Sequence, residues 1–278
     1  MLVALKDILY LAEAKKCAVG SFNVPNLEAV CAVIDAAESL RQPVILSHAQ
    51  VHEELGLARL DVIGRVMLMM AERASVPVCV HLDHGESLDY LHRALDLGFT
   101  SIMYDGSTLP YAQNVANTRI AVSMAAEYGA SVEAEIGSMG TREDGQSGPG
   151  GYVYTDPDEA KKFAEETGID ALACAFGTAH GIYKTAPKLD FDRVCRIREK
   201  ISVPIVMHGG SGVSTEDYKK VIDCGVRKIN YFTYMSKAGG TAAASLEDHT
   251  FFHDIIRAGQ EGMRTDAEKA IRTFARLD

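Results

Sequence analysis

The sequence predicts an α/β protein built as a single (β/α)8 TIM barrel with an extended C-terminal helical region. Short β-branched apolar runs alternate with longer amphipathic segments along the whole chain, a pattern typical of βα units in a parallel sheet. The apolar runs number eight, and no Pro/Ser-rich linker separates them. The length of 278 residues is also close to the roughly 250 residues that such a barrel takes. We therefore expect one domain over residues 1–278 rather than two doubly wound domains.

The expected elements follow one another in regular order. The eight strands are predicted at Cys17–Val24, Pro43–His48, Val76–His84, Ser101–Asp105, Ser131–Ile136, Ala171–Gly177, Pro204–Gly209 and Lys228–Thr233. Helices are predicted at Leu27–Leu40, Ser87–Leu97, Pro110–Tyr128, Asp156–Thr167, Asp190–Lys200 and Thr215–Asp223. Capping residues support these boundaries, because Ser and Asp favour helix starts and Gly favours helix ends. They are Ser87, Asp156 and Ser214 or Thr215 at starts, and Gly98, Gly129, Gly168 and Gly225 after ends.

Two stretches depart from this repeat. Gly137–Tyr154 contains six glycines and one proline, which predicts a long mobile surface loop, either a lid or a disordered excursion. The region from about Ser236 to Asp278 is longer than one barrel helix requires. We expect it to pack on a neighbouring subunit.

Composition limits the class of partner. The chain has 28 Lys+Arg against 38 Asp+Glu, a net charge of −10, which argues against nucleic acid or an anionic membrane as the main partner. The N-terminal segment carries charges within its apolar run, so it does not resemble a signal peptide. We expect a cytoplasmic protein, and we expect all six cysteines to be reduced core residues because they show no C-x-x-C spacing.

Polar residues gather where the predicted strands end. In a barrel of this type the active site lies at the C-terminal ends of the strands, so these residues should meet at one face. They include Ser21, Asn23, His81, Asp83, His84, Asp105, Ser107, Glu133, Glu135, His180, His208, Ser211, Asn230 and Thr233.

Three of these residues predict a metal site. His84, His180 and His208 come from three different strand ends and could hold one zinc ion with a fourth position open. Asp105 and Glu135 are strand-end carboxylates that could form a second cation site, an alternative metal position or the hydrogen-bonded layer that orients the imidazoles. The histidines that do not share this placement, among them His52, His81, His92 and His249, are interpreted as structural.

Glycine-rich turns predict a phosphate site beside the metal. The motifs G-T-A-H-G (Gly177–Gly181) and H-G-G-S-G (His208–Gly212) expose backbone N–H groups at strand ends, and such turns bind phosphate oxygens. The N-Y-F-T turn before the last helical region and Lys184 add to this site. A phosphorylated small molecule is therefore the expected ligand.

Together these motifs resemble the class II, zinc-dependent ketose-bisphosphate aldolases, the family of fructose- and tagatose-bisphosphate aldolases. The resemblance runs from about Leu5 to Ala275, with H-L-D-H-G, D-G-S, V-E-A-E-I-G, G-T-A-H-G and H-G-G-S-G in the family's order. It implies a (β/α)8 fold, homodimers or homotetramers and a role in carbohydrate metabolism such as glycolysis. It also implies the reversible cleavage of a phosphorylated ketose into dihydroxyacetone phosphate and an aldehyde.

The resemblance also assigns roles to residues. His84, His180 and His208 match the zinc ligands, while Glu135 and Asp105 match positions that bind a second cation, monovalent or divalent, or a displaced metal. Asp83 matches the acid/base at the C4 hydroxyl, and Glu143, in the motif T-R-E-D-G, is the candidate for moving the proton on the dihydroxyacetone phosphate carbon. Substrate contacts are implied for Asn23, Gly181, Lys184, Gly209, Gly210, Ser211, Asn230, Tyr231, Phe232, Thr233 and Arg257.

The chemistry is consistent with these residue types. Cleavage of a C–C bond next to a ketone leaves an enediolate, whose charge zinc can stabilise as a Lewis acid. Lys228, near a strand edge, is the one lysine within a predicted strand, so the sequence does not favour a Schiff-base route.

Three positions differ from the bisphosphate-cleaving members of the family. His253 stands four residues before Arg257 where an arginine is usual, Ala49 stands at the second strand end, and Phe232 occupies the third position of N-Y-F-T. Neither His nor Ala replaces an arginine's bidentate grip on phosphate. We hypothesise that the aldehyde is not simply glyceraldehyde 3-phosphate, although Arg257 or another basic residue could compensate.

Two other functions remain open from the sequence. One is a non-catalytic sugar-phosphate-binding subunit of an aldolase complex, which the intact set of predicted catalytic residues disfavours. The other is a metal-dependent sugar-phosphate epimerase on the same barrel, which would interconvert ketose epimers without releasing dihydroxyacetone phosphate.

Overall fold

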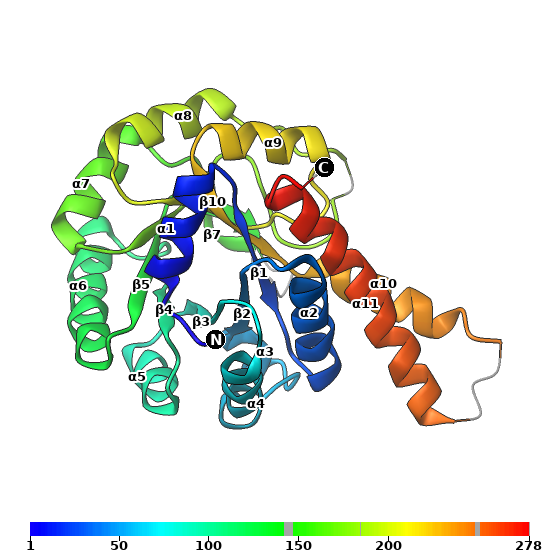
Figure 1. The fold of residues 1–278 in the computed structure, drawn as a ribbon. Coiled ribbons are helices and arrows are strands. Elements are labelled where there is room, and N and C mark those ends of the chain that lie inside the picture. The colour runs from blue at the N-terminus through cyan, green and yellow to red at the C-terminus, as the bar shows by residue number, and fades with distance from the viewer. Residues whose placement is uncertain (142–146, 184, 248–250, 278) are drawn as a thin grey trace.

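Eight parallel strands close into a barrel at the centre of the molecule (Figure 1). The structure is a computed structural model that describes residues 1–141, 147–183, 185–247 and 251–277. Around the barrel the strand order is β1-β10-β9-β8-β5-β4-β3-β2. The strands are β1 (Val19–Asn23), β2 (Val44–Ala49), β3 (Val78–Gly85), β4 (Ser101–Tyr104), β5 (Ser131–Ile136), β8 (Ala171–Cys174), β9 (Ile205–Met207) and β10 (Val226–Tyr231). The predicted TIM barrel is confirmed, and every predicted strand overlaps one of these.

Helices surround the barrel as the amphipathic segments predicted. They are α2 (Leu27–Leu40), α4 (Leu60–Arg73), α5 (Leu88–Leu97), α6 (Tyr111–Tyr128), α7 (Pro157–Thr167), α8 (Phe191–Lys200) and α9 (Thr215–Asp223), with the short α3 (Gln50–Glu54) after β2. Side chains of Ser87, Asp156 and Ser214 accept backbone N–H bonds at helix starts, as expected for N-caps. None of the described helices combines the length and apolarity needed to cross a bilayer.

Helix α1 (Leu5–Lys15) packs across the N-terminal end of the barrel. Its buried residues Leu5, Ile8 and Leu9 share an apolar cluster with the barrel-lining Val19 and Ile45. This end of the barrel is therefore filled by apolar side chains, and the opposite end is left for the polar residues at the C-terminal strand ends.

The glycine-rich stretch Gly137–Tyr154 departs from the predicted loop. It contains the antiparallel strands β6 (Ser138–Thr141) and β7 (Ser147–Val153). The prediction of an irregular loop was wrong for these two arms because glycine and proline, which usually mark turns, are tolerated in short edge strands. Glu143, the predicted proton-transfer residue, lies outside the described residues, as does Lys184.

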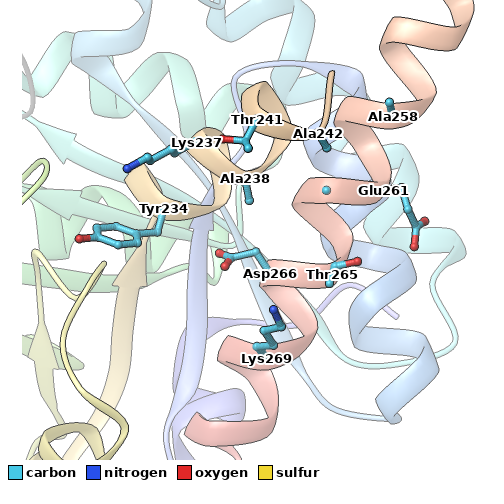
Figure 2. A pocket seen from close by; sticks show the side chains of 11 residues that line it. Tyr234, Lys237, Ala238, Thr241, Ala242, Ala258, Glu261, Thr265, Asp266 and Lys269 are labelled. Carbon is cyan, nitrogen blue, oxygen red and sulfur yellow. The ribbon is translucent and has the colours of Figure 1, made fainter. Parts of the chain in front are cut away.

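The C-terminal region forms two packed helices, α10 (Thr233–Ala244) and α11 (Phe252–Phe274). The C-terminal half of α11 covers the barrel, while its first half extends outward beside α10 (Figure 1). Glycines allow the close approach, since a Cβ at Gly262 would stand 2.7 Å from the Ala238 carbonyl oxygen. A groove of about 700 Å³ runs between the two helices (Figure 2), and Tyr234, Lys237 and Asp266 are among its lining residues.

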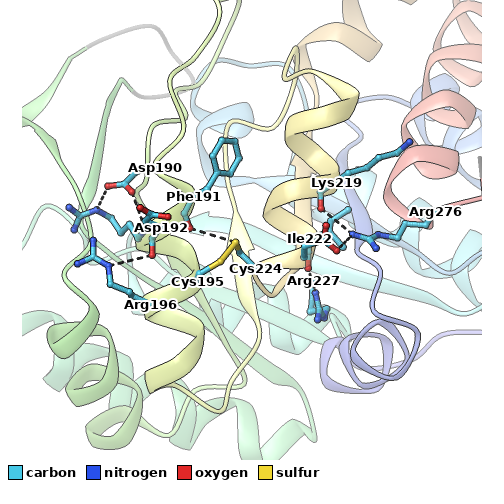
Figure 3. The surroundings of a disulfide bond; sticks show 12 residues. Asp190, Phe191, Asp192, Cys195, Arg196, Lys219, Ile222, Cys224, Arg227 and Arg276 are labelled. Atoms are coloured by element: carbon cyan, nitrogen blue, oxygen red, sulfur yellow. Dashed lines mark hydrogen bonds and ion pairs between the residues drawn. A yellow bond between two sulfur atoms is a disulfide. The ribbon is translucent and has the colours of Figure 1, made fainter.

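A disulfide joins Cys195 in α8 to Cys224 at the end of α9 (Figure 3). The prediction that all six cysteines are reduced was therefore wrong for this pair, whereas Cys17, Cys31, Cys79 and Cys174 are free. The two residues are 29 positions apart and lie on neighbouring barrel helices. Only the three-dimensional packing of α8 against α9 brings them together, so their spacing in the sequence carried no signal.

Candidate metal centre and active site

The inner surface of the barrel is polar in its C-terminal half. Side chains alternate between the two faces of a strand, so residues two apart share the barrel interior. This period places polar pairs inside β1, β3, β5 and β10, and all of these side chains are buried. The pairs are Ser21 and Asn23, His81 and Asp83, Glu133 and Glu135, and Lys228 and Asn230.

Asp83 and His84 are adjacent in β3, yet both contribute to this polar interior. The pairing of β3 with β4 shifts register between Leu82 and Gly85, and His84 has the left-handed backbone angle φ = 45°. A bulge of this kind re-aims a side chain that a regular strand would point to the opposite face. Strained backbone of this type is found disproportionately at functional sites.

Three imidazoles converge at the C-terminal end of the barrel. Ligand atoms of His84, His180 and His208 all lie within 4.8 Å of one another. Their ring centroids are separated by 4.5 Å for His84 and His208 and by 5.1 Å for His84 and His180. The convergence predicted from three separate strand ends is therefore present in the structure.

Two carboxylates orient two of these rings. Nδ1 of His84 lies 2.7 Å from Oδ2 of Asp105, and Nε2 of His208 lies 2.8 Å from Oε1 of Glu133. Each carboxylate accepts an N–H bond, so the remaining nitrogens, Nε2 of His84 and Nδ1 of His208, carry the free lone pairs. These two nitrogens face each other at 2.8 Å. Carboxylate-held imidazoles of this kind are typical of metal-binding histidines.

Lys228 supports this arrangement from inside the barrel. Its side chain is fully buried, with Nζ 2.9 Å from Oε2 of Glu133 and 2.7 Å from Oδ1 of Asn230. Burial alone would raise the pKa of Glu133, but Lys228 and His208 outweigh it and lower that pKa to about 2. Lys228 is thus held in an ion pair rather than near an edge, and Glu133 holds His208. The sequence suggested neither role, because both depend on the register between β5, β9 and β10.

A second group of possible ligands lies next to the first. His84, Asp105 and Glu135 offer ligand atoms within 4.8 Å of one another. Oε2 of Glu135 is buried and has no hydrogen-bond partner, and burial together with Asp105 raises the pKa of Glu135 well above its ordinary value. A cation bound at this group would satisfy that oxygen, so these residues fit the predicted second cation site.

Asp83 is held between two amides. Nδ2 of Asn230 donates to its Oδ1 and Nδ2 of Asn23 donates to its Oδ2, each at 3.0 Å. Burial would raise the pKa of Asp83, but the nearby His84, His208 and Lys228 hold it well below the ordinary value. Asp83 is therefore a buried, ionised carboxylate with a fixed orientation, as a base for a substrate hydroxyl requires.

A pocket of about 290 Å³ lies beside the imidazoles. Eight of the predicted substrate-contact residues line it, namely Asn23, Gly181, Gly209, Ser211, Asn230, Tyr231, Phe232 and Thr233. Thr233 is not the end of a strand, as expected, but the first residue of α10. The positive end of a helix dipole therefore faces the pocket, which favours an anion.

Backbone geometry explains the glycines of this pocket. Gly209 has φ = 62°, and a Cβ there would stand 2.5 Å from the Ala179 carbonyl oxygen, so only glycine fits between the two turns. The hydroxyl of Tyr183 ties the turns together by donating to the Gly209 carbonyl oxygen and accepting from the Ala179 N–H.

Two predicted contacts are placed elsewhere. The N–H of Gly210 donates to the Asn230 carbonyl oxygen at 3.1 Å, so it is not free for a ligand. Arg257 is exposed on α11 and is not among the residues that line the pocket within one chain.

Comparison with known proteins agrees with this geometry. The family model for class II fructose-bisphosphate aldolase matches residues 3–277. The chain is 38% identical over 273 residues to the uncharacterized protein YdjI of Escherichia coli, covering 97% of each. It is 42% identical over 233 residues to a probable fructose-bisphosphate aldolase of Bacillus subtilis, covering 84% of this chain and 81% of the relative. The crystal structure of the YdjI aldolase superposes with a TM-score of 0.88, covering 99% of this chain and 97% of that one. The chain therefore belongs to the class II fructose-bisphosphate aldolase family and is an aldolase, a carbon–carbon lyase.

Proposed function

We propose that this aldolase is zinc-dependent and reversibly cleaves a phosphorylated ketose into dihydroxyacetone phosphate and an aldehyde. The observation that carries the proposal is the convergence of His84, His180 and His208. Three imidazoles with an open fourth position are a typical catalytic zinc site. When bound, zinc would supply Lewis-acid stabilisation for the enediolate charge that C–C cleavage creates.

In this proposal the chain's own residues position the substrate and move its protons. Asp83 accepts the proton of the C4 hydroxyl during cleavage and returns it during condensation. Asn23 and Asn230 keep both carboxylate oxygens of Asp83 oriented for this transfer. Glu143 moves the proton on the donor carbon. Asp105 and Glu135 hold a second cation beside His84.

The donor phosphate is proposed to bind at the glycine turns. Backbone N–H groups of Gly181, Gly209 and Ser211 and the first turn of α10 supply the donors, and Lys184 supplies a positive charge. The helix N-terminus and the left-handed glycines of the pocket support this assignment.

We further propose that the aldehyde product is not simply glyceraldehyde 3-phosphate. No Lys or Arg is found among the described residues that line the pocket. Ala49 is buried beside Asp83 and offers no polar group, and His253 is exposed on α11. A distal phosphate would therefore lack a bidentate arginine in this part of the chain.

A homodimer or homotetramer in the cytoplasm is proposed for the assembly. Phe251 and Phe252, at the start of α11, are 58% and 74% exposed. They lie on the helix pair that extends away from the barrel, and exposed aromatic residues of this kind mark contact surfaces. Sizing by light scattering would show a mass of two or four chains, whereas a single-chain mass at micromolar concentration would contradict the proposal.

Two variants test the proposed chemistry. His180→Ala removes an imidazole, so it should lose bound zinc and cleavage activity together. Glu143→Ala leaves the imidazoles intact, so it should retain zinc but lose exchange of the donor C–H with solvent. Zinc content by metal analysis and deuterium uptake into dihydroxyacetone phosphate by NMR give the two readouts. Full deuterium exchange in Glu143→Ala would remove Glu143 from its role.

A further inference from the structure

An aromatic contact closes the side of the pocket that faces β1 and β2. The rings of Phe232 and His52 have centroids 4.9 Å apart with an interplanar angle of 48°. Phe232 follows β10, and His52 lies in α3, which follows β2. Because β1 stands between β10 and β2 in the barrel, this contact crosses the C-terminal end of β1. His52 is only 2% exposed, so it is a fixed support for the Phe232 ring.

Phe232 also marks the boundary between two parts of the site. Its backbone N–H donates to the Ser211 hydroxyl oxygen at 2.9 Å, on the side of the glycine turns. Its ring contacts His52 on the opposite side. With the donor phosphate at the glycine turns and the metal ligands on β3, β8 and β9, the sector left for the aldehyde lies over β1, β2 and β3.

This sector is poor in cations. Its described polar groups include Asn23 and Asp83, which bond to each other. The arginines closest in sequence to His52 are committed to other groups, Arg59 to Asp61 and, across the α3–α5 contact, Arg93 to Glu53. A phosphate brought against the Phe232 ring would lose hydration without gaining a charged partner, which is unfavourable. An uncharged hydroxyalkyl chain would instead gain apolar contact with the ring.

We propose that Phe232, supported by His52, is a specificity determinant that makes the acceptor an uncharged hydroxyaldehyde rather than a phosphorylated one. This inference rests on the proposed aldolase function and adds to it the residue pair that selects the aldehyde. It assigns His52 a role in the site, although the sequence suggested only a structural one.

The test is a comparison of two acceptors that differ only in the phosphate. Condensation with dihydroxyacetone phosphate is measured for glyceraldehyde and for glyceraldehyde 3-phosphate, and the ratio of their kcat/KM values is the readout. The zinc-loaded wild-type protein should favour glyceraldehyde. Phe232→Arg should shift the ratio toward the phosphorylated acceptor by at least about tenfold, since pocket contacts of this size change discrimination by that order.

Matched variants separate charge from bulk. Phe232→Leu keeps an apolar side chain and should leave the ratio within about threefold of wild type. His52→Ala removes the support without adding charge and should weaken the preference for glyceraldehyde through KM more than through kcat. It also keeps the test decisive if Phe232→Arg does not fold.

Two results would overturn the inference while leaving the aldolase function intact. One is a wild-type preference for glyceraldehyde 3-phosphate. The other is an unchanged ratio in both Phe232→Arg and His52→Ala. In either case zinc-dependent deuterium exchange into dihydroxyacetone phosphate by the wild-type protein would show that donor activation persists. Loss of that exchange in the wild-type protein would overturn the aldolase proposal itself and this inference with it.

Discussion

The chain of contacts His208, Glu133 and Lys228 shows how single residues prepare the site. Glu133 accepts from Nε2 of His208, which leaves Nδ1 of that ring available as a ligand. A buried carboxylate without a nearby cation would tend to protonate, and Lys228 prevents this by pairing with it at 2.9 Å. Lys228 is therefore a positioning residue, which acts on the imidazole through Glu133.

Replacement of Lys228 by methionine tests this role. Lys228→Met keeps the length and apolar stem but removes the charge, so the hold of Glu133 on His208 should weaken. Zinc affinity should fall by about 10- to 100-fold, the usual effect of losing an outer partner of a metal ligand. Competition with a chromophoric chelator measures the Kd, and Lys219→Met on the exposed face of α9 is the matched control. A zinc Kd within twofold of wild type in a folded Lys228→Met protein would contradict the role.

His48 predicts how stability depends on pH. It is buried behind β2, with Nε2 2.9 Å from the Tyr90 hydroxyl, and burial lowers its pKa from 6.5 to about 4. Between these two pH values the unfolded chain binds more protons at this residue than the folded chain does. The free energy of unfolding should therefore fall as the pH drops from 6.5 to 4, by at most about 3 kcal/mol from this group.

The variant His48→Gln removes the titrating group. Urea unfolding at a series of pH values should show a shallower loss of stability between pH 6.5 and 4 than in wild type. His92→Gln, on the exposed face of α5, should keep the wild-type slope. Equal slopes in wild type and His48→Gln would show that His48 does not remain neutral when folded.

Individual site residues could be predicted from the sequence where the barrel topology alone decides their position. His84, His180 and His208 follow three strands, and parallel strand ends meet at one face, so their convergence could be foreseen. The roles of Glu133 and Lys228 could not, because they depend on which residues face each other across strands. The same holds for His52, which reaches the pocket only through the turn that α3 makes after β2.

At the scale of elements, the helices and strands were predictable and the cross-connections were not. α2, α9 and β5 have the bounds that capping and periodicity predicted. The hairpin of β6 and β7 was missed because its glycines removed the alternating pattern on which strand prediction depends. The disulfide was missed because no local pattern links α8 to the end of α9.

The disulfide predicts a redox-dependent stability. It closes a loop across 29 positions, which should contribute roughly 2–4 kcal/mol by restricting the unfolded chain. Reduction should lower the Tm by about 5–10 °C in a protein of this size. In the cytoplasm, where we propose the protein acts, glutathione favours the reduced pair, so both states are relevant.

Thermal unfolding with and without a thiol reductant measures this difference. The double variant Cys195→Ser with Cys224→Ser should have the lower Tm in both conditions, while Cys31→Ser should keep the wild-type response. Titration of the denatured protein should give four thiols before reduction and six after it. Six thiols in the protein as purified from an oxidising buffer would contradict the disulfide.

At the scale of the whole molecule, the barrel separates stability from chemistry. α1 and the apolar cluster fill the N-terminal end, while imidazoles, carboxylates and amides occupy the C-terminal end. The net charge of −10 is compatible with an anionic ligand because the site relies on helix dipole, backbone amides and bound cations rather than on surface charge. The extended α10 and α11 pair leaves exposed aromatic residues that the single chain does not cover.

The most direct test of the central claim is the release of dihydroxyacetone phosphate from a panel of ketose phosphates, measured in a coupled assay with and without a chelator. The account predicts release by the zinc-loaded protein, loss of release after chelation, recovery when zinc is restored, and a preference for ketose monophosphates over bisphosphates. Undiminished release by protein whose metal content has been shown to be negligible would contradict the zinc-dependent mechanism. A large kcat/KM preference for fructose or tagatose 1,6-bisphosphate would contradict the proposed aldehyde.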